Sequence, residues 1–421
     1  MITTIFITII ATAVVIVFLM NFQTSEKKIQ RNVIKEYEVA NPQFSRSISA
    51  LLGPSFISGN NVSILSNGNE IFPEMLNAIK NAQITITFET FVYWGGSIGE
   101  EFAVALSERA QANVKVHVLL DWVGSNKMKQ QQIDKMINAG VQIQRYHKPR
   151  WSNLQHFNNR THRKILVLDG SIGFTGGVGI ADLWRGNASN PNEWRDTHFK
   201  VTGPVVSQMQ AVFMDNWIKA QGQVLHSALY FPELQPTGNM TAQMFSSSDS
   251  GGSDSMQLLY LMAITAASHS IELSTAYFVP DALSSAALIA AAKRGVKIRI
   301  ITPGKHIDKE LVRKASKACW GDLLKSNISI AEYQPTMYHC KIFIVDNLLV
   351  SVGSTNFDNR SFRLNDEANL NVLDQQFAEL QLDLFNKDWE KSRPITYAVW
   401  LNRSFREKVL EKIAVIMKSQ M

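Results

Sequence analysis

Apolar positions along much of the chain alternate between the spacing of an amphipathic helix and that of a buried strand. Phe72, Met75, Leu76 and Ile79 recur at helical intervals, and an apolar, β-branched run follows them. We predict helix, strand, helix and strand in turn over residues 72–82, 84–93, 100–112 and 114–120, with a further helix before Gly140. This alternation predicts an α/β fold.

The same order of elements returns in the second half of the chain. Helix, strand, helix and strand are predicted there over residues 258–267, 271–279, 282–294 and 296–302. Ala82, Ile86, Phe88, Thr90 and Tyr93 match Ala267, Ile271, Leu273, Thr275 and Phe278 at one offset (267 − 82 = 185). We therefore expect two pseudo-symmetric lobes, each a mixed sheet flanked by helices, with a shared site at their interface.

The first twenty residues carry no charged side chain. As a helix they would cross a hydrocarbon layer of about 30 Å. Because no basic region or cleavage site precedes Asn21, we favour a transmembrane anchor over residues 1–20, followed by a juxtamembrane segment over 21–58. Basic residues at Lys27, Lys28, Arg31 and Lys35 follow the anchor and favour a single-pass cell-membrane protein with a cytoplasmic catalytic part. A buried core helix is the alternative.

Two further segments differ in composition from the repeated units. Residues 237–256 are rich in Ser, Gly, Asp and Thr and are predicted to be a linker between a first lobe over 59–236 and a second over 257–395. Residues 396–421 are predicted as a C-terminal amphipathic helix, since Leu401, Phe405, Val409 and Ile413 recur every four residues. That stripe is expected to cover a domain core, and a membrane interface is the alternative.

Composition narrows the function classes. The chain has 421 residues, 45% of them hydrophobic, and 42 Lys and Arg against 36 Asp and Glu, a net charge of +6. A disordered chain is excluded, and two cysteines are too few for a disulfide framework or a cysteine-based zinc site. The modest positive charge permits an anionic partner without indicating nucleic acid.

One short motif occurs twice. His162, Lys164 and Asp169 form the pattern H-x-K-x4-D, and His339, Lys341 and Asp346 repeat it 177 residues later (339 − 162 = 177). Six residues after each Asp stand Gly176-Gly177 and Gly353-Ser354-Thr355-Asn356. A chance match to such a pattern occurs at about one position per million, so two copies in one register indicate a duplicated function.

Alternate side chains of a strand point to the same side, so the His and Lys of each motif face one anion. Two histidines and two lysines suit phosphodiester transfer without metal or cofactor. One imidazole attacks phosphorus and the other handles the proton, while the lysines, Ser354 and Asn356 stabilise the phosphate oxygens. Asp169 and Asp346 have the opposite parity, and we expect them to fix a strand end or the neighbouring loop.

Each histidine also needs a partner that fixes its tautomer. The downstream carboxylates Asp196 and Glu367 are the candidates, with an ordinary structural hydrogen bond as the alternative for both. A basic and aromatic stretch over 145–163, which includes Arg160, leads into the first motif. It could recognise anionic lipid headgroups or form a solvated loop.

These residues resemble the phospholipase D superfamily, whose signature is the duplicated H-x-K-x4-D-x6-G-S-x-N. The resemblance covers Gly59 to Arg393, and the stretches at 162–164, 173–177 and 353–370 are similar to bacterial cardiolipin synthases. It implies two phospholipase D-type lobes that join two phosphatidylglycerol molecules and release glycerol through a phosphatidyl-histidine. By analogy the attacking residue is His162, with His339 as acid and base. Phosphate contacts are implied for Gly176, Gly177, Gly353, Ser354 and Asn356.

The sequence departs from that family at Gly179, where cardiolipin synthases commonly carry Asn, and in having one candidate membrane span where many have two. A phospholipid hydrolase, a metal-independent nuclease and a non-catalytic lipid-binding scaffold are the alternative functions. The predicted anchor and the small net charge argue against nucleic acid. The acceptor, the membrane topology and the oligomeric state stay open.

Overall fold

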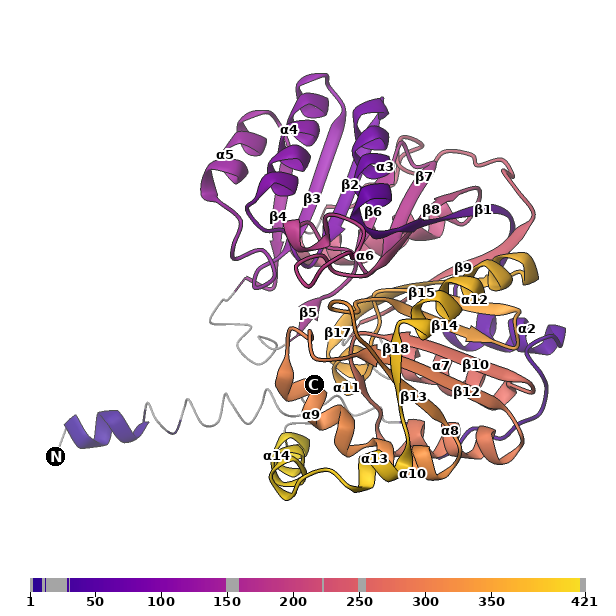
Figure 1. Cartoon of the computed structure of the whole chain (residues 1–421). Helices are drawn as coiled ribbons and strands as arrows, with labels where there is room; N and C mark the ends of the chain where they lie inside the picture. The colour runs from indigo at the N-terminus through magenta and orange to yellow at the C-terminus, as the bar shows by residue number, and fades with distance from the viewer. Residues whose placement is uncertain are drawn as a thin grey trace.

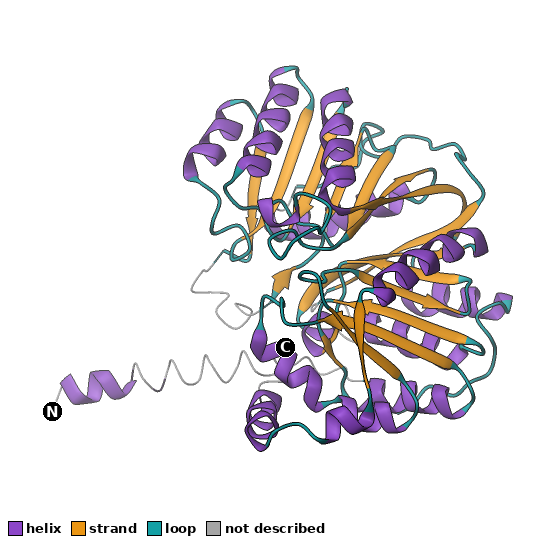
Figure 2. Ribbon diagram, viewed as in Figure 1, coloured by secondary structure: helices purple, strands orange, loops and turns teal. Residues whose placement is uncertain are grey.

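The computed structural model of the chain describes residues 3–9, 12, 29, 31–148, 159–221, 223–248 and 255–416. Two α/β lobes lie one above the other, with helices on the far side of each lobe and also near the level where the lobes meet (Figure 1). The strands of both lobes lie between these helices (Figure 2). The predicted α/β fold with two repeated lobes is confirmed.

The first lobe follows the predicted order. Its strands are β1 (Ile57–Ser66), β2 (Thr85–Thr90), β3 (Lys115–Asp121), β4 (Gln142–Tyr146), β5 (Arg160–Thr161), β6 (Ile165–Leu168), β7 (Ile172–Gly176) and β8 (Thr197–Thr202). Its helices are α3 (Asn67–Asn81), α4 (Ser97–Gln111), α5 (Gln130–Asn138), the 3₁₀ turn η2 (Asp182–Trp184) and α6 (Val206–Gln221).

The second lobe repeats these elements and adds a C-terminal extension. Its strands are β9 (Met240–Ser247), β10 (Ser270–Thr275), β11 (Phe278–Val279), β12 (Lys297–Pro303), β13 (Ser329–Tyr333), β14 (Lys341–Val345), β15 (Leu349–Gly353), β16 (Phe357–Asp358), β17 (Asn365–Leu373) and β18 (Ser392–Ile395). Its helices are α7 (Ser255–Ala266), α8 (Ala282–Lys293), α9 (Glu310–Ala318), α10 (Trp320–Lys325), α11 (Asn359–Arg363), α12 (Gln375–Glu390), α13 (Tyr397–Leu401) and α14 (Phe405–Ile416).

The sheets of the two lobes join through the antiparallel pair β1 and β9, and β5 of the first lobe also pairs with β17 of the second. Outward from β1 and β9 the order is β8-β7-β6-β2-β3-β4 on one side and β17-β15-β14-β10-β12-β13 on the other. In each lobe the three outer strands of this series are parallel, and the motif strand, β6 or β14, is antiparallel to its neighbour. The pseudo-symmetry therefore places the two motif strands at equivalent positions.

The strand β9 corrects the predicted linker over 237–256. It lies between β1 and β17 in the continuous sheet, and it is the counterpart of β1 in the repeat. The strand was not predicted because it contains polar residues, which we expected to be exposed. One of them, Gln243, is buried and accepts a hydrogen bond from Asn371 Nδ2. The second lobe thus begins before residue 257, whereas residues 249–254 lie outside the described part of the chain.

The two chain ends also differ from expectation. Most of the predicted anchor lies outside the described residues, residues 3–9 are helical, and no described helix has the length and apolar character needed to cross a membrane. In the predicted juxtamembrane segment, α2 (Pro42–Leu52) inserts Phe44 and Ile48 into the core of the second lobe. The α2 part of this segment therefore belongs to the folded body.

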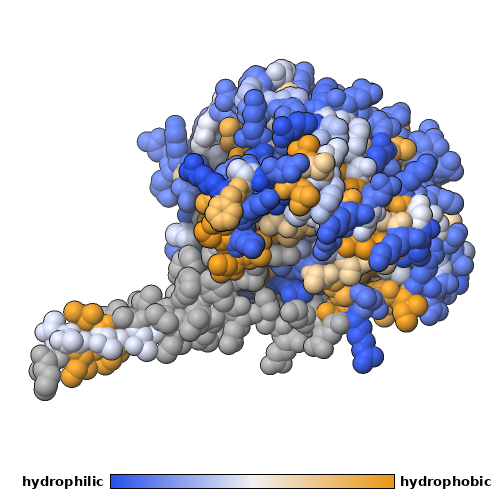
Figure 3. Space-filling model, turned by 60° about the horizontal axis from the view of Figure 1, so that its bottom comes forward, coloured by the Kyte–Doolittle hydropathy of each residue, from blue (hydrophilic) through white to orange (hydrophobic). Residues whose placement is uncertain are grey.

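The C-terminal segment forms two helices, α13 and α14, rather than one. The predicted apolar stripe does not cover a core, because Phe405 is 83% exposed and Leu401, Val409 and Ile413 are also exposed. The helix α14 packs on α9 through its buried Ala414 instead. On the face that forms the bottom of Figure 1, apolar side chains stand among charged ones (Figure 3).

Candidate active site

The two histidines lie where each lobe pairs with the other. The His162 N–H donates to the carbonyl of Asp366 in the second lobe (2.8 Å), and the His339 N–H donates to the carbonyl of Arg195 in the first lobe (2.8 Å). In both cases the accepting residue immediately precedes a predicted carboxylate. Backbone pairing thus brings each histidine beside a carboxylate of the opposite lobe.

The side chains complete two histidine–carboxylate pairs. His162 Nδ1 lies 3.0 Å from both carboxylate oxygens of Glu367, and His339 Nδ1 lies 2.7 Å from Asp196 Oδ2. Both carboxylates are fully buried. Since Nδ1 of each ring is engaged by the carboxylate, Nε2 is the nitrogen left for a substrate.

The two carboxylates differ in charge. Burial opposes ionisation of Asp196, but His339 and Lys341 outweigh it and hold its pKa below the usual range. Burial raises the pKa of Glu367 to about 7, although Lys164 and a hydrogen bond from Ser354 act in the other direction. At neutral pH, His339 therefore faces an ionised carboxylate and His162 faces a carboxyl group that is partly protonated.

The histidines themselves are poor bases in the empty pocket. Burial, with Lys164 and Lys341 nearby, lowers the pKa of His162 well below its usual range. Burial and Lys341 lower the pKa of His339 to about 4, while Asp196 acts to raise it. Both rings are therefore neutral in the empty pocket, which is the form in which an imidazole can attack as a nucleophile.

Both motif lysines are buried beside their histidines. Lys164 Nζ donates to the His162 carbonyl (2.7 Å), and Lys341 Nζ donates to the His339 carbonyl (2.5 Å). Burial lowers the pKa of Lys164 to about 7 and also lowers that of Lys341. A bound phosphate is negatively charged and would stabilise the protonated form of both lysines. The site therefore favours an anion.

Asp169 and Asp346 do the same task at the far ends of the motif strands. The Asp169 carboxylate accepts backbone N–H groups from Gln83, Ile84 and Thr85, and that of Asp346 accepts them from residues 268–270. Both residues have a left-handed backbone, with φ of 51° and 53°. The expectation that they fix a neighbouring loop matches this geometry, and neither is among the described residues that line the pocket.

The glycines after each motif serve close packing. A Cβ on Gly177 would lie 2.2 Å from Asp196 Oδ1, and one on Gly353 would lie 2.2 Å from the Ala368 carbonyl oxygen. At Gly176, φ is 153° and a Cβ would lie 2.6 Å from the Thr197 carbonyl oxygen. Because glycine has no Cβ atom, the chain segments that carry Asp196 and Glu367 can approach the strands that follow each motif.

Only one of the five residues with an implied phosphate contact, Asn356, is among the described pocket-lining residues. Ser354 lies behind the pocket, where its hydroxyl donates to Glu367 Oε2 (2.5 Å). In this structure Ser354 and the three glycines support the carboxylates and their strands, and their implied phosphate contacts stay a prediction.

Gly179 occupies the position in the first lobe that Asn356 occupies in the second. A Cβ at Gly179 would lie 2.7 Å from Val92 Cβ and 3.3 Å from the Trp184 ring. Trp184 also donates from Nε1 to Asp196 Oδ2 (3.0 Å). Aromatic packing therefore takes the space that a carboxamide would need.

A cavity of about 850 Å³ opens onto both histidines and Lys164. Several of the residues that line it lie outside the repeated motif. Aromatic rings contribute at Phe91, Trp94, Trp184 and Trp194, and polar groups at Arg160, Tyr277, Lys309, Asp358 and Arg360. The Phe91 ring lies 5.2 Å from that of His162, and the rings of Trp184 and Trp194 each lie 5.3 Å from that of His339.

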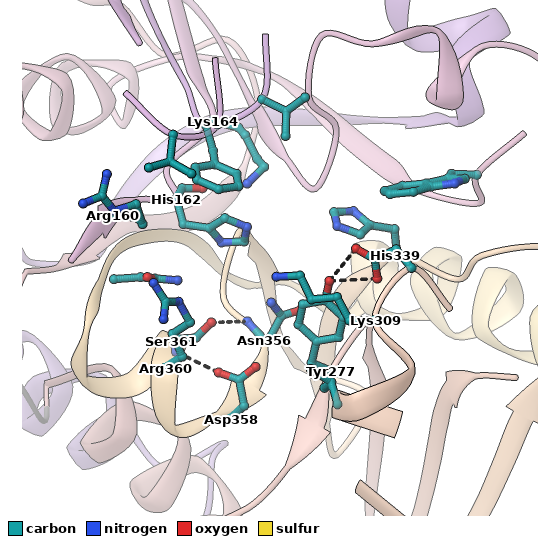
Figure 4. Close-up of a pocket in the computed structure, with 18 of the residues that line it drawn as sticks. Arg160, His162, Lys164, Tyr277, Lys309, His339, Asn356, Asp358, Arg360 and Ser361 are labelled. Carbon is teal, nitrogen blue, oxygen red and sulfur yellow. Dashed lines mark hydrogen bonds between the residues drawn. The ribbon is translucent and has the colours of Figure 1, made fainter. Parts of the chain in front are cut away.

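Figure 4 shows how these groups are distributed. His162 and His339 lie close together, Arg160 and Arg360 lie on the His162 side, and Lys309 and Tyr277 lie on the other. Arg160 was included in the predicted basic stretch, and Asp358 and Arg360 in the stretch that carried the family resemblance. No local pattern pointed to the aromatic residues, because they lie in three separate segments: the connection between β2 and α4, the turn η2, and the loop before β8.

Comparison with known proteins supports the resemblance. The family model described as cardiolipin synthase, PLD-like domain, matches residues 75–215 and 260–389. Cardiolipin synthase A of Pseudomonas syringae pv. syringae is 33% identical over 341 residues, which is 81% of this chain and 71% of that protein. Cardiolipin synthase A of Pseudomonas fluorescens is 32% identical over 340 residues, 80% of this chain and 70% of that protein.

Solved structures share the fold. A phosphatidylserine synthase of Haemophilus influenzae superposes with a TM-score of 0.68 at 14% identity, covering 90% of this chain and 99% of that one. A polyphosphate kinase of Porphyromonas gingivalis has a TM-score of 0.52 at 12% identity, covering 94% of this chain and 57% of that one. The family match spans both motifs, so the chain belongs to the cardiolipin synthase family of phospholipase D-like enzymes.

Proposed function

We propose that this protein is a phosphatidyltransferase that joins two phosphatidylglycerol molecules and releases glycerol. The observation that carries the proposal is the pair of histidines that face one cavity, each with Nδ1 held by a buried carboxylate of the opposite lobe. Two such groups can act as nucleophile and as acid and base on the same phosphorus. The family relationship supports a phospholipid as the substrate.

In the first step, His162 Nε2 attacks the phosphorus of one phosphatidylglycerol. A phosphorus–nitrogen bond forms and the bond from phosphorus to the terminal glycerol oxygen breaks. The negative charge of the bound phosphodiester, together with Asp196, favours the protonated form of His339. His339 gives this proton to the glycerol oxygen, and glycerol leaves. Lys164, Lys341 and Asn356 stabilise the phosphate oxygens while the charge on them grows.

In the second step, the terminal hydroxyl of a second phosphatidylglycerol replaces His162. His339, now neutral, takes the hydroxyl proton as the new phosphorus–oxygen bond forms and the phosphorus–nitrogen bond breaks. The assignment of roles follows from the carboxylates, since the ionised Asp196 stabilises the protonated form of His339. His162, whose pKa is lowered by burial and by the two lysines beside it, is suited to remain neutral and attack.

The aromatic walls favour an alcohol of a lipid over water as the acceptor. Phe91, Trp184 and Trp194 contact the two catalytic rings and keep water from the far side of the pocket. The charge-free segment at residues 1–20 supports attachment to the cell membrane, with the catalytic part in the cytoplasm. Such attachment would place the cavity near its lipid substrates.

The test is mass spectrometry of the lipids formed when the purified full chain meets phosphatidylglycerol vesicles, with a chelator present throughout. We expect cardiolipin and free glycerol in equal amounts, and losses of at least about 10³-fold in both His162→Ala and His339→Ala. Phosphatidic acid as the sole product would show a hydrolase instead. No turnover of phospholipid, with cleavage of nucleic acid, would replace the proposal with a nuclease.

A further inference from the structure

Two arginines, Arg160 on β5 and Arg360 on α11, line the cavity beside His162 (Figure 4). Neither belongs to the repeated motif. We propose that this arginine pair binds the phosphodiester of the acceptor lipid, the second phosphatidylglycerol of the reaction. The inference rests on the proposed function, because it concerns the second substrate of that reaction.

The arginine pair is formed by one residue from each lobe, at the interface between the lobes. Arg160 belongs to the first lobe, but its strand pairs with β17 of the second lobe, opposite Asn365. Arg360 belongs to the second lobe, on the short helix α11 that directly precedes β17. Arg160 is 5% exposed and Arg360 is partly buried, so both guanidinium groups are largely removed from bulk water.

The nearby carboxylates are already engaged by the backbone. Asp121 accepts N–H groups from Val123 (2.9 Å), Gly124 (3.0 Å) and Thr161 (3.2 Å), and it lies 3.7 Å from Arg160 Nη1. Asp358 accepts the Ser361 N–H (2.7 Å) at the start of α11. Asp121 forms an ion pair with Arg160, and Asp358 attracts Arg360, so a bound anion would share the two guanidinium groups with carboxylates that also hold the loops in place.

The electrostatics of the pair favour a bound anion. Burial lowers the pKa of Arg160, and burial together with the charge of Arg160 lowers that of Arg360. Two buried guanidinium groups that repel one another gain most from a group with two negative oxygens between them. The planar guanidinium binds phosphate through paired hydrogen bonds, which a lysine cannot provide.

The chemistry of the reaction requires such a site. Its product contains two phosphodiesters joined by a single three-carbon glycerol, so the pocket must hold a second negative phosphate close to the reacting one. Lys164 and Lys341 lie beside the catalytic histidines and serve the reacting phosphate. Among the described residues that line the same cavity, Arg160 and Arg360 supply the guanidinium groups, and they are the candidates for binding the second phosphate.

Lys309 is the competing cation in the cavity. Its ammonium group lies 5.4 Å from the centre of the Tyr277 ring, on the side of the pocket away from the arginine pair. Its side chain is exposed to solvent. It therefore offers a flexible single charge, and the experiment includes it as the alternative location.

The experiment separates the acceptor from the rest of the reaction. Full-length enzyme acts on phosphatidylglycerol vesicles, and we measure cardiolipin formation, phosphatidic acid formation and exchange of labelled glycerol into phosphatidylglycerol. Glycerol exchange reverses the first step with an acceptor that has no phosphate. The variants are Arg160→Gln, Arg360→Gln, the corresponding Lys variants and Lys309→Gln, with the remote surface change Arg46→Gln as the matched control.

For both Gln variants we expect cardiolipin formation to fall about tenfold to 100-fold, because a charge-assisted contact to the acceptor is lost. Glycerol exchange should stay within about twofold of the wild type, which also shows that the variant is folded. The ratio of phosphatidic acid to cardiolipin should rise accordingly. The Lys variants should recover part of the loss, and Arg46→Gln should match the wild type.

Two results would overturn the arginine site while the proposed function stands. One is an equal fall in glycerol exchange and cardiolipin formation, which would place the arginines on the donor phosphate or in the framework. The other is a wild-type product ratio in the arginine variants, with the change found in Lys309→Gln instead. A wild-type enzyme that forms no cardiolipin would overturn the proposed function, and the arginine site with it.

Discussion

The two lobes supply the same backbone framework to the site but surround their histidines differently. His339 contacts the rings of Trp184 and Trp194 and pairs with Asp196, and these three partners come from the first lobe. His162 pairs with Glu367 of the second lobe, whose carboxylate is held by Ser354. The comparison teaches that duplication fixed the positions of the reactive groups, while later divergence set their charge states.

The divergence is visible at one pair of equivalent positions. Gly179 makes room for Val92 and Trp184 in the first lobe, whereas Asn356 presents a carboxamide to the cavity in the second. The pocket is therefore apolar around His339 and more polar around His162. A site with two unlike halves can give its two histidines different tasks, which two identical halves could not.

Substitution of the two carboxylates should give the largest difference between the lobes. Asp196→Asn should lower kcat about 10³-fold, because it removes an ionised partner that stabilises protonated His339. Glu367→Gln should lower it about tenfold, since that carboxyl has a pKa of about 7 and is partly neutral already. Steady-state cardiolipin formation at pH 7 measures both.

The pH profile provides the control for this prediction. In the proposed mechanism, ionised Glu367 stabilises a positively charged His162 adduct, and the bound phosphate keeps Lys164 protonated. Wild-type kcat should therefore rise as the pH increases through about 7. That rise should be absent in Glu367→Gln and present in Asp196→Asn. Equal losses in both variants, or an unchanged profile in Glu367→Gln, would contradict the difference between the lobes.

Acid should destabilise the first lobe through His117, the third residue of β3. Burial lowers the pKa of His117 to about 4, whereas Arg299, the third residue of β12, pairs with Glu272 (3.2 Å). Between pH 6.5 and about 4 the unfolded chain binds a proton that the folded chain does not. The free energy of unfolding should therefore fall by on the order of 3 kcal/mol as the pH drops through this window.

Denaturant unfolding at several pH values measures this dependence. His117→Gln keeps a partner for the Tyr230 hydroxyl (2.8 Å in the wild type) and should make the dependence shallower between pH 6.5 and 4. Arg299→Gln should leave the slope in that window unchanged. A slope that is the same in His117→Gln and the wild type would refute the assignment to this histidine.

Restoring symmetry at Gly179 should cost stability. Gly179→Asn would force a Cβ to within 2.7 Å of Val92 Cβ, and we expect a loss of about 2 kcal/mol in the free energy of unfolding. The reciprocal change, Asn356→Gly, should alter stability less but lower kcat by removing a donor from the pocket. Thermal unfolding and kcat measured on both variants test this, and a fully stable, active Gly179→Asn enzyme would show that the aromatic packing is not needed.

The smallest difference between the lobes is expected at the motif aspartates. Asp169→Ala and Asp346→Ala each remove a carboxylate that accepts three backbone N–H groups, and each should lower the free energy of unfolding by about 1 to 3 kcal/mol. The two losses should agree within about 0.5 kcal/mol. A kcat loss in folded enzyme as large as that of the histidine variants would give these residues a direct catalytic role instead.

Local patterns predicted the helices and strands around each motif because both elements have a regular spacing of apolar residues. They failed at β9, whose buried Gln243 accepts a hydrogen bond from Asn371 on the adjacent strand β17. They also failed at the C-terminus, where the apolar stripe of α14 is exposed. Whether a residue of β9 or α14 is buried depends on which distant element packs against it. The spacing of apolar residues within one segment does not contain that information.

The sequence by itself determined the reactive groups. The parity of H-x-K on a strand sets His and Lys on one side, and the opposite parity of Asp169 and Asp346 sends them to the loops. Only the tertiary structure decided that Glu367 serves His162 and that Asp196 serves His339, across 205 and 143 residues of chain. The physical reason is that side-chain direction follows from local backbone geometry, whereas these pairings follow from how two whole lobes pack together.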